Sequence, residues 1–190
     1  MIIFLHGFNS VGRGVKAQML EDYFPDLVHA PDYPVHDPDR AIPFLQTFIE
    51  TSLAGNDTGN SLLLIGSSLG GFYANWLAVK YKTKCVMINP STHPWLTLQQ
   101  CLGENVNYYT KHTYELTQDM LNAMSEFVLS DCADGTPRLV LLDADDEVLD
   151  YSVARDQFEY CAEVIVYEGG SHRFDHMPEA LVEIDRMYSF

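Results

Sequence analysis

Three side chains in this chain of 190 residues have the types and surroundings needed for nucleophilic acyl transfer: a serine, a histidine and an acid. Ser68 is the centre of Gly66-x-Ser68-x-Gly70, which follows an apolar run of strand length and precedes a helical pattern. This is the nucleophile-elbow signature, in which a strained turn lifts the hydroxyl above a sheet. Glycines leave room where a β-carbon would collide across the turn. Ser67 is the rival nucleophile, but only Ser68 is flanked symmetrically by glycines.

Acyl transfer also requires N–H groups that stabilise the oxyanion. The N–H of Leu69 opens the expected helix and therefore has no intrahelical partner. The first apolar run of the chain leads into His-Gly-Phe-Asn-Ser at residues 6–10, which resembles the oxyanion loop of α/β-hydrolases. This resemblance implies that the N–H of Phe8 is the second donor. An ordinary glycine-rich turn is the alternative. His6 and Asn9 lie beside these donors and are possible substrate-binding residues.

The base is expected after a strand, because functional loops of parallel α/β sheets gather at the carboxyl ends of the strands. Three of the seven histidines lie in or near such loops: His6, His93 and His172. His172 directly follows the last expected strand and gives the serine–acid–histidine order of α/β-hydrolases. His176 has a spacing from His172 that suits metal chelation on a helix, but no third ligand is evident, so no metal is predicted.

The acid is expected in the acidic run that follows the apolar residues 139–142. Four aspartates compete for the role: Asp143, Asp145, Asp146 and Asp150. In the α/β-hydrolases that the chain resembles, the acid stands a few residues past the strand and just before a Glu-Val step. This resemblance favours Asp146, with Asp145 as runner-up and several of the others solvated. An EF-hand loop is excluded because Val148 stands where glycine is required. An aspartyl-phosphate enzyme would need a later lysine, and none follows Lys111.

The elements that must position these residues alternate between strands and helices. Continuous apolar runs predict buried strands at residues 2–5, 27–30, 61–65, 84–88, 139–142 and 164–167. Apolar residues at helical spacing predict helices over residues 15–23, 38–53, 69–81, 119–129 and 151–160, and from 178 onward. This alternation predicts a three-layer α/β/α sandwich with a parallel sheet of about six strands, in a single domain over residues 1–190.

Residues 91–116 are the least regular part of the sequence and are expected to cover the active site. This segment carries four large aromatic residues among polar ones: Trp95, Tyr108, Tyr109 and Tyr114. They line an acyl pocket, with Trp95 as a possible substrate-binding residue, or they cover the core beneath a long loop.

Composition excludes several classes of function. The chain has 27 acidic and 11 basic residues, a formal charge of −16, which argues against binding to nucleic acids or anionic membranes. No apolar run approaches the roughly 20 residues that span a bilayer, and no signal peptide opens the chain, so a cytoplasmic protein is expected. Four widely separated cysteines are expected to be reduced thiols: Cys85, Cys101, Cys132 and Cys161.

Four segments together resemble the small bacterial YqiA/YcfP-type esterases of the α/β-hydrolase superfamily: residues 6–10, 66–71, 146–150 and 170–174. The resemblance covers essentially the whole chain. It implies a minimal α/β-hydrolase fold without a long lid, and an enzyme that cleaves a small carboxylic ester or thioester without a cofactor. In that family's mechanism Ser68 is the nucleophile, His172 the base and Asp146 the acid.

Two other functions remain open from the sequence. Arg13, Lys16 and Arg173 flank the expected site and would receive the phosphates of coenzyme A if the protein were an acyl-CoA thioesterase. A non-catalytic binding protein on the same fold is the second alternative, although such a relative would usually lose a member of the triad.

Overall fold

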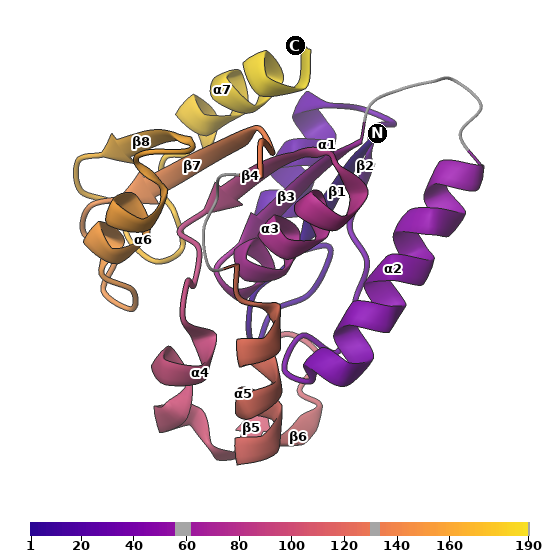
Figure 1. Cartoon of the computed structure of the whole chain (residues 1–190), viewed down its shortest axis with the longest axis vertical. Coiled ribbons are helices and arrows are strands. Elements are labelled where there is room, and N and C mark those ends of the chain that lie inside the picture. The colour runs from indigo at the N-terminus through magenta and orange to yellow at the C-terminus, as the bar shows by residue number, and fades with distance from the viewer. Residues whose placement is uncertain (56–61, 130–133, 190) are drawn as a thin grey trace.

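The centre of the molecule is a six-stranded parallel sheet (Figure 1). The computed structural model describes residues 1–55, 62–129 and 134–189. The strands lie in the order β2-β1-β3-β4-β7-β8. Their bounds are β1 Ile2–Leu5, β2 Val28–His29, β3 Leu63–Ser67, β4 Lys84–Ile88, β7 Arg138–Asp143 and β8 Glu163–Tyr167. All five neighbouring pairs are parallel, so the predicted sheet is confirmed.

Each face of the sheet packs against its own set of helices, because alternate strand residues point to opposite faces. Leu5 and Leu64 belong to the core cluster beneath α2, α3 and α6, whereas Phe4 and Ile65 belong to the cluster beneath α1 and α7. The bounds are α1 Val15–Tyr23, α2 Pro38–Ala54, α3 Leu69–Tyr81, α6 Tyr151–Phe158 and α7 Met177–Ser189. The architecture is therefore the predicted three-layer sandwich.

The winding direction of the chain reverses between β1 and β3. From β1 the chain passes through α1 to β2 at one edge, and then returns through α2 to β3 on the other side of β1. From β3 it continues outward through β4 and β7 to β8. Open parallel sheets bind ligands outside the carboxyl ends of the strands at such a reversal. The fold therefore places the loop after β1 beside the turn after β3.

The segment over residues 91–116 is more regular than expected. It contains the short helix α4 (Pro94–Thr97), a 3-10 turn (Gln99–Cys101) and an antiparallel hairpin. The hairpin pairs β5 (Gly103–Val106) with β6 (Thr113–Leu116), outside the main sheet. Helix α5 (Gln118–Met124) ends in a 3-10 turn and is shorter than the helix expected over residues 119–129. Figure 1 shows α4, α5 and the hairpin gathered at one end of the molecule.

The cysteines differ in part from expectation. Cys85 and Cys101 are free thiols, and burial raises the pKa of Cys85 to about 12. Cys161 is disulfide-bonded, which contradicts the reduced state expected for it, and Cys132 lies outside the described residues. Among the helices of the described ranges, none is long and apolar enough to cross a membrane.

Candidate active site

The sharp turn between β3 and α3 places Ser68 in a conformation that few non-glycine residues adopt. Its φ is +54° and its ψ is −122°. A β-carbon on Gly66 would collide with the carbonyl oxygen of Gly70, and one on Gly70 would collide with the carbonyl oxygen of Leu5. The two glycines therefore allow α3 to leave the turn in direct contact with β1, as an elbow requires.

This close approach predicts a large loss of stability when Gly70 is replaced with alanine. The new β-carbon would meet the backbone of β1, which cannot move aside as a flexible side chain can. We expect the free energy of unfolding to fall by about 3 kcal/mol, as measured by urea denaturation. Gly55→Ala is the matched control, because a β-carbon there meets only ordinary contacts of 3.7 and 3.9 Å. Equal stability of the two variants would contradict this account of the turn.

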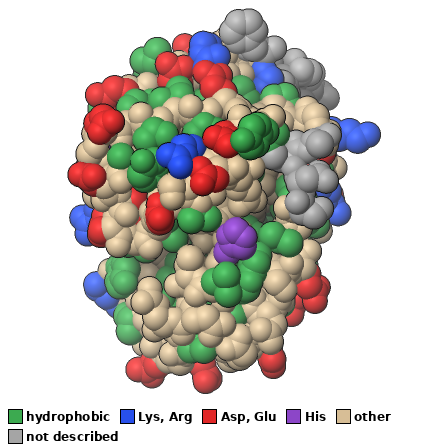
Figure 2. Space-filling model, turned by 60° about the vertical axis from the view of Figure 1, so that its left-hand side comes forward, with side chains coloured by type: hydrophobic (Ala, Val, Ile, Leu, Met, Phe, Trp, Pro, Cys, Tyr) green, Lys and Arg blue, Asp and Glu red, His purple; other side chains and the backbone are tan. Residues whose placement is uncertain are grey.

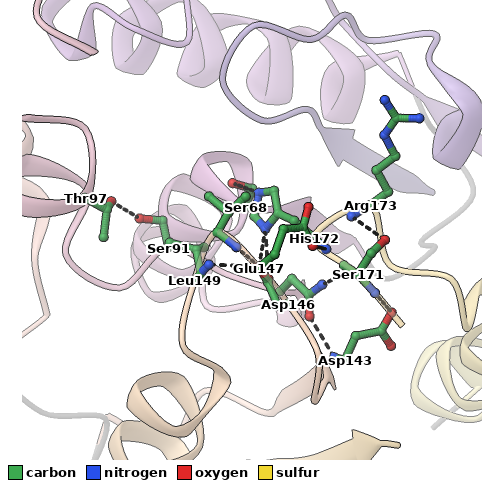
Figure 3. A network of polar contacts seen from close by, with 12 residues as sticks. Ser68, Ser91, Thr97, Asp143, Asp146, Glu147, Leu149, Ser171, His172 and Arg173 are labelled. Carbon is green, nitrogen blue, oxygen red and sulfur yellow. Dashed lines mark hydrogen bonds and ion pairs between the residues drawn. The ribbon is translucent and has the colours of Figure 1, made fainter. Parts of the chain in front are cut away.

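Ser68, His172 and Asp146 form one continuous line of hydrogen bonds (Figure 3). The His172 Nε2 atom lies 3.1 Å from the Ser68 Oγ atom. The His172 Nδ1 atom lies 2.8 and 3.1 Å from the two carboxylate oxygens of Asp146. The Asp146 side chain is 2% exposed and that of His172 22% exposed. Three segments far apart in the sequence therefore bring a hydroxyl, an imidazole and a buried carboxylate together.

Two backbone N–H groups fix the orientation of the Asp146 carboxylate. Val148 and Leu149 donate to its Oδ1 atom at 2.9 and 2.8 Å, which leaves Oδ2 facing His172. The backbone N–H of His172 donates to Glu147 Oε2 at 2.9 Å, so the loop that bears the histidine is also tied to the acidic run. A carboxylate only accepts hydrogen bonds, so the proton of a neutral His172 lies on Nδ1 and the free lone pair of Nε2 faces Ser68.

The other aspartates of the acidic run have different surroundings. Asp145 is exposed, and its backbone N–H donates to the carbonyl of Gly169 at 3.0 Å. Asp150 caps α6 by accepting from the Ser152 N–H at 2.9 Å. Between the two candidates retained from the sequence, only Asp146 contacts the imidazole of His172.

The loop after β1 approaches the serine closely. A β-carbon on Gly7 would lie 3.6 Å from the Ser68 Oγ atom. Within the described part of the chain, neither the Phe8 N–H nor the Leu69 N–H donates to a protein acceptor. The carbonyl of Ser68 instead accepts from the N–H groups of Gly71 and Phe72 at the start of α3. The two predicted oxyanion donors therefore flank the serine on adjacent elements and are available to a ligand.

His6 and Asn9 are buried inside this loop, which does not fit the substrate-binding role considered for them. His6 is 3% exposed, its Nδ1 atom lies 2.9 Å from the Gly7 carbonyl oxygen, and burial lowers its pKa. Asn9 is 5% exposed and accepts from the Tyr114 hydroxyl at 2.5 Å. Both side chains are held within the loop, while the buried Nε2 atom of His6 has no hydrogen-bond partner among the described residues.

The covering segment packs directly on the same loop. The ring of Tyr114 in β6 stacks on that of His36 with the ring centroids 3.9 Å apart. It meets the ring of Phe8 edge-on with the centroids 6.0 Å apart. Asn107, between β5 and β6, donates to the carbonyl of Ser10 at 2.7 Å. Trp95 of α4 is half-buried and packs edge-on against Phe72 of α3. Trp95 therefore borders the helix that begins at the elbow and remains a candidate wall for a substrate.

A second imidazole–carboxylate pair lies beside the first and was not predicted. The Asp143 side chain is fully buried, and the His176 Nδ1 atom lies 2.7 Å from its Oδ1 atom. Asp143 is therefore not one of the solvated acids of the run. Its place at the end of an apolar strand was the signal available in the sequence, since a buried carboxylate requires partners. The rings of His172 and His176 bind separate carboxylates and do not converge as a pair of metal ligands.

Comparison with known sequences places the chain in a bacterial family. The model of the uncharacterised protein family UPF0227 matches residues 1–189. A UPF0227 protein of Vibrio parahaemolyticus is 27% identical over 186 residues, which cover 95% of each chain. One of Shewanella oneidensis is 26% identical over 187 residues, which cover 97% of each chain. These matches confirm the family resemblance seen in the sequence.

Solved structures share the fold at low sequence identity. Est1E of Butyrivibrio proteoclasticus has a TM-score of 0.76 at 14% sequence identity, and the alignment covers 98% of this chain and 87% of the Est1E chain. The mouse α/β-hydrolase domain-containing protein 10 has a TM-score of 0.74 at 18% sequence identity, and the alignment covers 99% of this chain and 89% of the mouse chain. A monoacylglycerol lipase of Paleococcus ferrophilus has a TM-score of 0.73 at 16% sequence identity, and the alignment covers 99% of this chain and 93% of the lipase chain. These likenesses establish the α/β-hydrolase fold.

Proposed function

The chain belongs to the UPF0227 family, and we propose that it is a serine hydrolase that cleaves small carboxylic esters through an acyl-enzyme. The observation that carries the proposal is the unbroken line of hydrogen bonds from the Asp146 carboxylate through the His172 imidazole to the Ser68 hydroxyl. The solved structures that share the fold include a monoacylglycerol lipase, which is consistent with hydrolytic chemistry.

The proposed mechanism uses each of these groups in turn. As the Ser68 Oγ atom attacks the ester carbonyl carbon, the Nε2 atom of His172 takes the hydroxyl proton. The oxyanion of the tetrahedral intermediate accepts from the Phe8 and Leu69 N–H groups, each worth about 3 kcal/mol of barrier height. Asp146 stabilises the imidazolium that forms. The intermediate then expels the alcohol, which takes the proton from His172, and water repeats the sequence to release the acid.

The surroundings of Ser68 favour a small substrate with an apolar acyl group. The described chain carries no long lid over the site, and its covering segment is a short helix and a hairpin. This segment exposes several large apolar side chains: Leu96, Leu102, Val106, Tyr108 and Tyr109. An apolar acyl group gains from contact with such a surface, whereas a charged one does not.

The thioesterase alternative rests on Arg13, Lys16 and Arg173. The Lys16 side chain is half-buried, and this burial lowers its pKa. The Arg13 guanidinium faces Glu21 at 3.6 Å. Figure 3 shows the Arg173 side chain directed away from Ser68. On the face drawn in Figure 2, Lys and Arg side chains lie among acidic ones and do not gather in a patch. The formal charge of −16 would also repel the phosphates of coenzyme A.

A panel of nitrophenyl esters and acyl-coenzyme A thioesters tests this choice. Nitrophenol is a good leaving group, so we expect acylation to outpace deacylation and the acyl-enzyme to accumulate. The result would be a burst of nitrophenol equal to the enzyme concentration, followed by slower turnover. We expect acyl-coenzyme A to react more slowly than the matched ester at every salt concentration. A preference for acyl-coenzyme A that weakens as salt is added would instead support the thioesterase. Lack of turnover of the whole panel would count against any hydrolase.

A further inference from the structure

The buried carboxylate of Asp143 forms hydrogen bonds with the backbone and a side chain of the loop that bears His172. Asp143 ends β7, and its Oδ2 atom accepts from the backbone N–H groups of Ser171 and Asp175 at 3.2 and 2.7 Å. Its Oδ1 atom pairs with the Nδ1 atom of His176 at 2.7 Å. All three donors come from the loop between β8 and α7, and they lie on both sides of His172. Asp143 therefore anchors that loop at both ends.

Residues next to Asp143 support its contacts with the loop. The Asn89 side chain accepts from the Asp143 N–H at 2.9 Å and donates to the Ser171 carbonyl at 3.0 Å, so it joins β4 to the same loop. Gly170 has a φ of +79°, and a β-carbon there would collide with the Asp143 carboxylate. The His176 ring stacks on Tyr167 of β8 with its centroid 4.9 Å away. The loop can approach Asp143 only because residue 170 is glycine.

The carboxylates of Asp146 and Asp143 have different hydrogen-bond partners and therefore different roles. Asp146 contacts the His172 imidazole itself, whereas the hydrogen bonds of the Asp143 carboxylate within the described residues go to the Ser171 and Asp175 N–H groups and to His176. A carboxylate has acceptors only, which suits Asp143, because every group directed at its oxygens is an N–H donor or an imidazole nitrogen. Removal of this side chain would leave two N–H groups without their acceptor and free the loop to shift.

We propose that Asp143, supported by His176, is a positioning residue that holds the His172 imidazole in line with the Ser68 hydroxyl. The inference rests on the proposed function, since it matters for rate only if His172 acts as the base. A displacement of about 1 Å in a catalytic group lowers the rate by about 100-fold, even when the mutated residue never touches the substrate. Asp143 would act in this way, by fixing the backbone on both sides of His172 without touching the substrate.

The first test compares Asp143→Ala with Asp143→Asn. At a temperature where both are folded, we expect Asp143→Ala to lower kcat for a nitrophenyl ester by about 100-fold with little change in KM. Asp143→Asn should restore most of this loss. Its amide oxygen can accept from both backbone N–H groups, and its NH₂ group can face His176 in the tautomer that accepts at Nδ1. Asp145→Asn, whose side chain is exposed, is the control and should retain the wild-type kcat.

A second readout needs no turnover. The proton that His172 Nδ1 shares with Asp146 can be followed by NMR, and we expect its resonance to shift or vanish in Asp143→Ala and persist in Asp143→Asn. If the wild type hydrolyses nothing but this resonance responds, only the proposed function fails. If the wild type is active and a folded Asp143→Ala variant retains its kcat and its resonance, the positioning inference is overturned. Equal losses in the alanine and asparagine variants would also overturn it.

A variant of His176 covers the case in which Asp143→Ala does not fold. His176→Phe keeps an aromatic ring against Tyr167 and removes both ring nitrogens, including the Nδ1 atom that pairs with Asp143. We expect kcat to fall about tenfold, with the His172 resonance shifted, because one of the three anchoring contacts is lost. A folded His176→Phe variant with the wild-type kcat and resonance would contradict the role given to this pair.

Discussion

Replacing Ser68 with alanine is expected to lower kcat/KM for a short-chain nitrophenyl ester by about 10⁶-fold, leaving only the residual rate that the oxyanion donors and substrate binding supply. The Oγ atom is the proposed nucleophile, and its removal leaves His172 with no hydroxyl to activate. Alanine retains the β-carbon of serine, so the strain of the positive φ at this position is unchanged. Steady-state assays beside a thermal unfolding curve would separate loss of activity from loss of structure.

Ser67→Ala is the control for this experiment. Ser67 is buried at the end of β3, with 6% of its surface exposed, and its hydroxyl is not aligned with His172 in any hydrogen bond of the described residues. The variant should therefore retain turnover. Undiminished hydrolysis by a folded Ser68→Ala variant would exclude Ser68 as the nucleophile, and loss of activity in Ser67→Ala alone would transfer the role to its neighbour.

Replacing Asp146 with asparagine is expected to lower kcat by about 10⁴-fold without unfolding the protein. The N–H groups of Val148 and Leu149 keep the amide oxygen at the Oδ1 position, so the NH₂ group takes the Oδ2 position, 2.8 Å from His172 Nδ1 in the native protein. A donor at that position forces the imidazole proton onto Nε2, toward Ser68. The histidine then cannot accept the hydroxyl proton.

The matched control for the acid is Asp145→Asn, one residue away. It removes the same charge from the same acidic run, but its carboxylate is exposed and does not contact His172. Measurement of kcat for both variants therefore separates a specific effect on the imidazole from a general change in the local field. Equal losses in the two variants would contradict the assignment of Asp146.

Buried strands were predictable because their sequences are continuously apolar, and helices because their apolar residues recur at helical spacing. The strands at Ile2–Leu5 and Lys84–Ile88 and the helix at Val15–Tyr23 have the predicted bounds. The hairpin of β5 and β6 was not predicted, because it is polar and half-exposed. Its place depends on contacts of Tyr114 with Phe8 and His36, which are remote in sequence and leave no local pattern.

The site was predictable where chemistry and chain order constrain the residue type. A serine between two glycines after a strand, and a histidine after the last strand, each leave few alternatives, and the two lie within hydrogen-bond distance. The pairing of His176 with Asp143 was missed although Asp143 ends an apolar strand, because the acidic run that it opens resembles a solvated loop. The register of β7 against β8, which pairs Asp143 with Tyr167, decides that this carboxylate is buried.

The most direct test of the central claim is covalent labelling by a fluorophosphonate, which reacts with a serine only when a base activates it. Labelled protein would be digested and the modified residue located by mass spectrometry. The account predicts one adduct per chain, on Ser68, with labelling strongly reduced in Asp146→Asn and abolished by prior unfolding. A folded wild-type protein that remains unlabelled, or that is labelled at another residue, would contradict it.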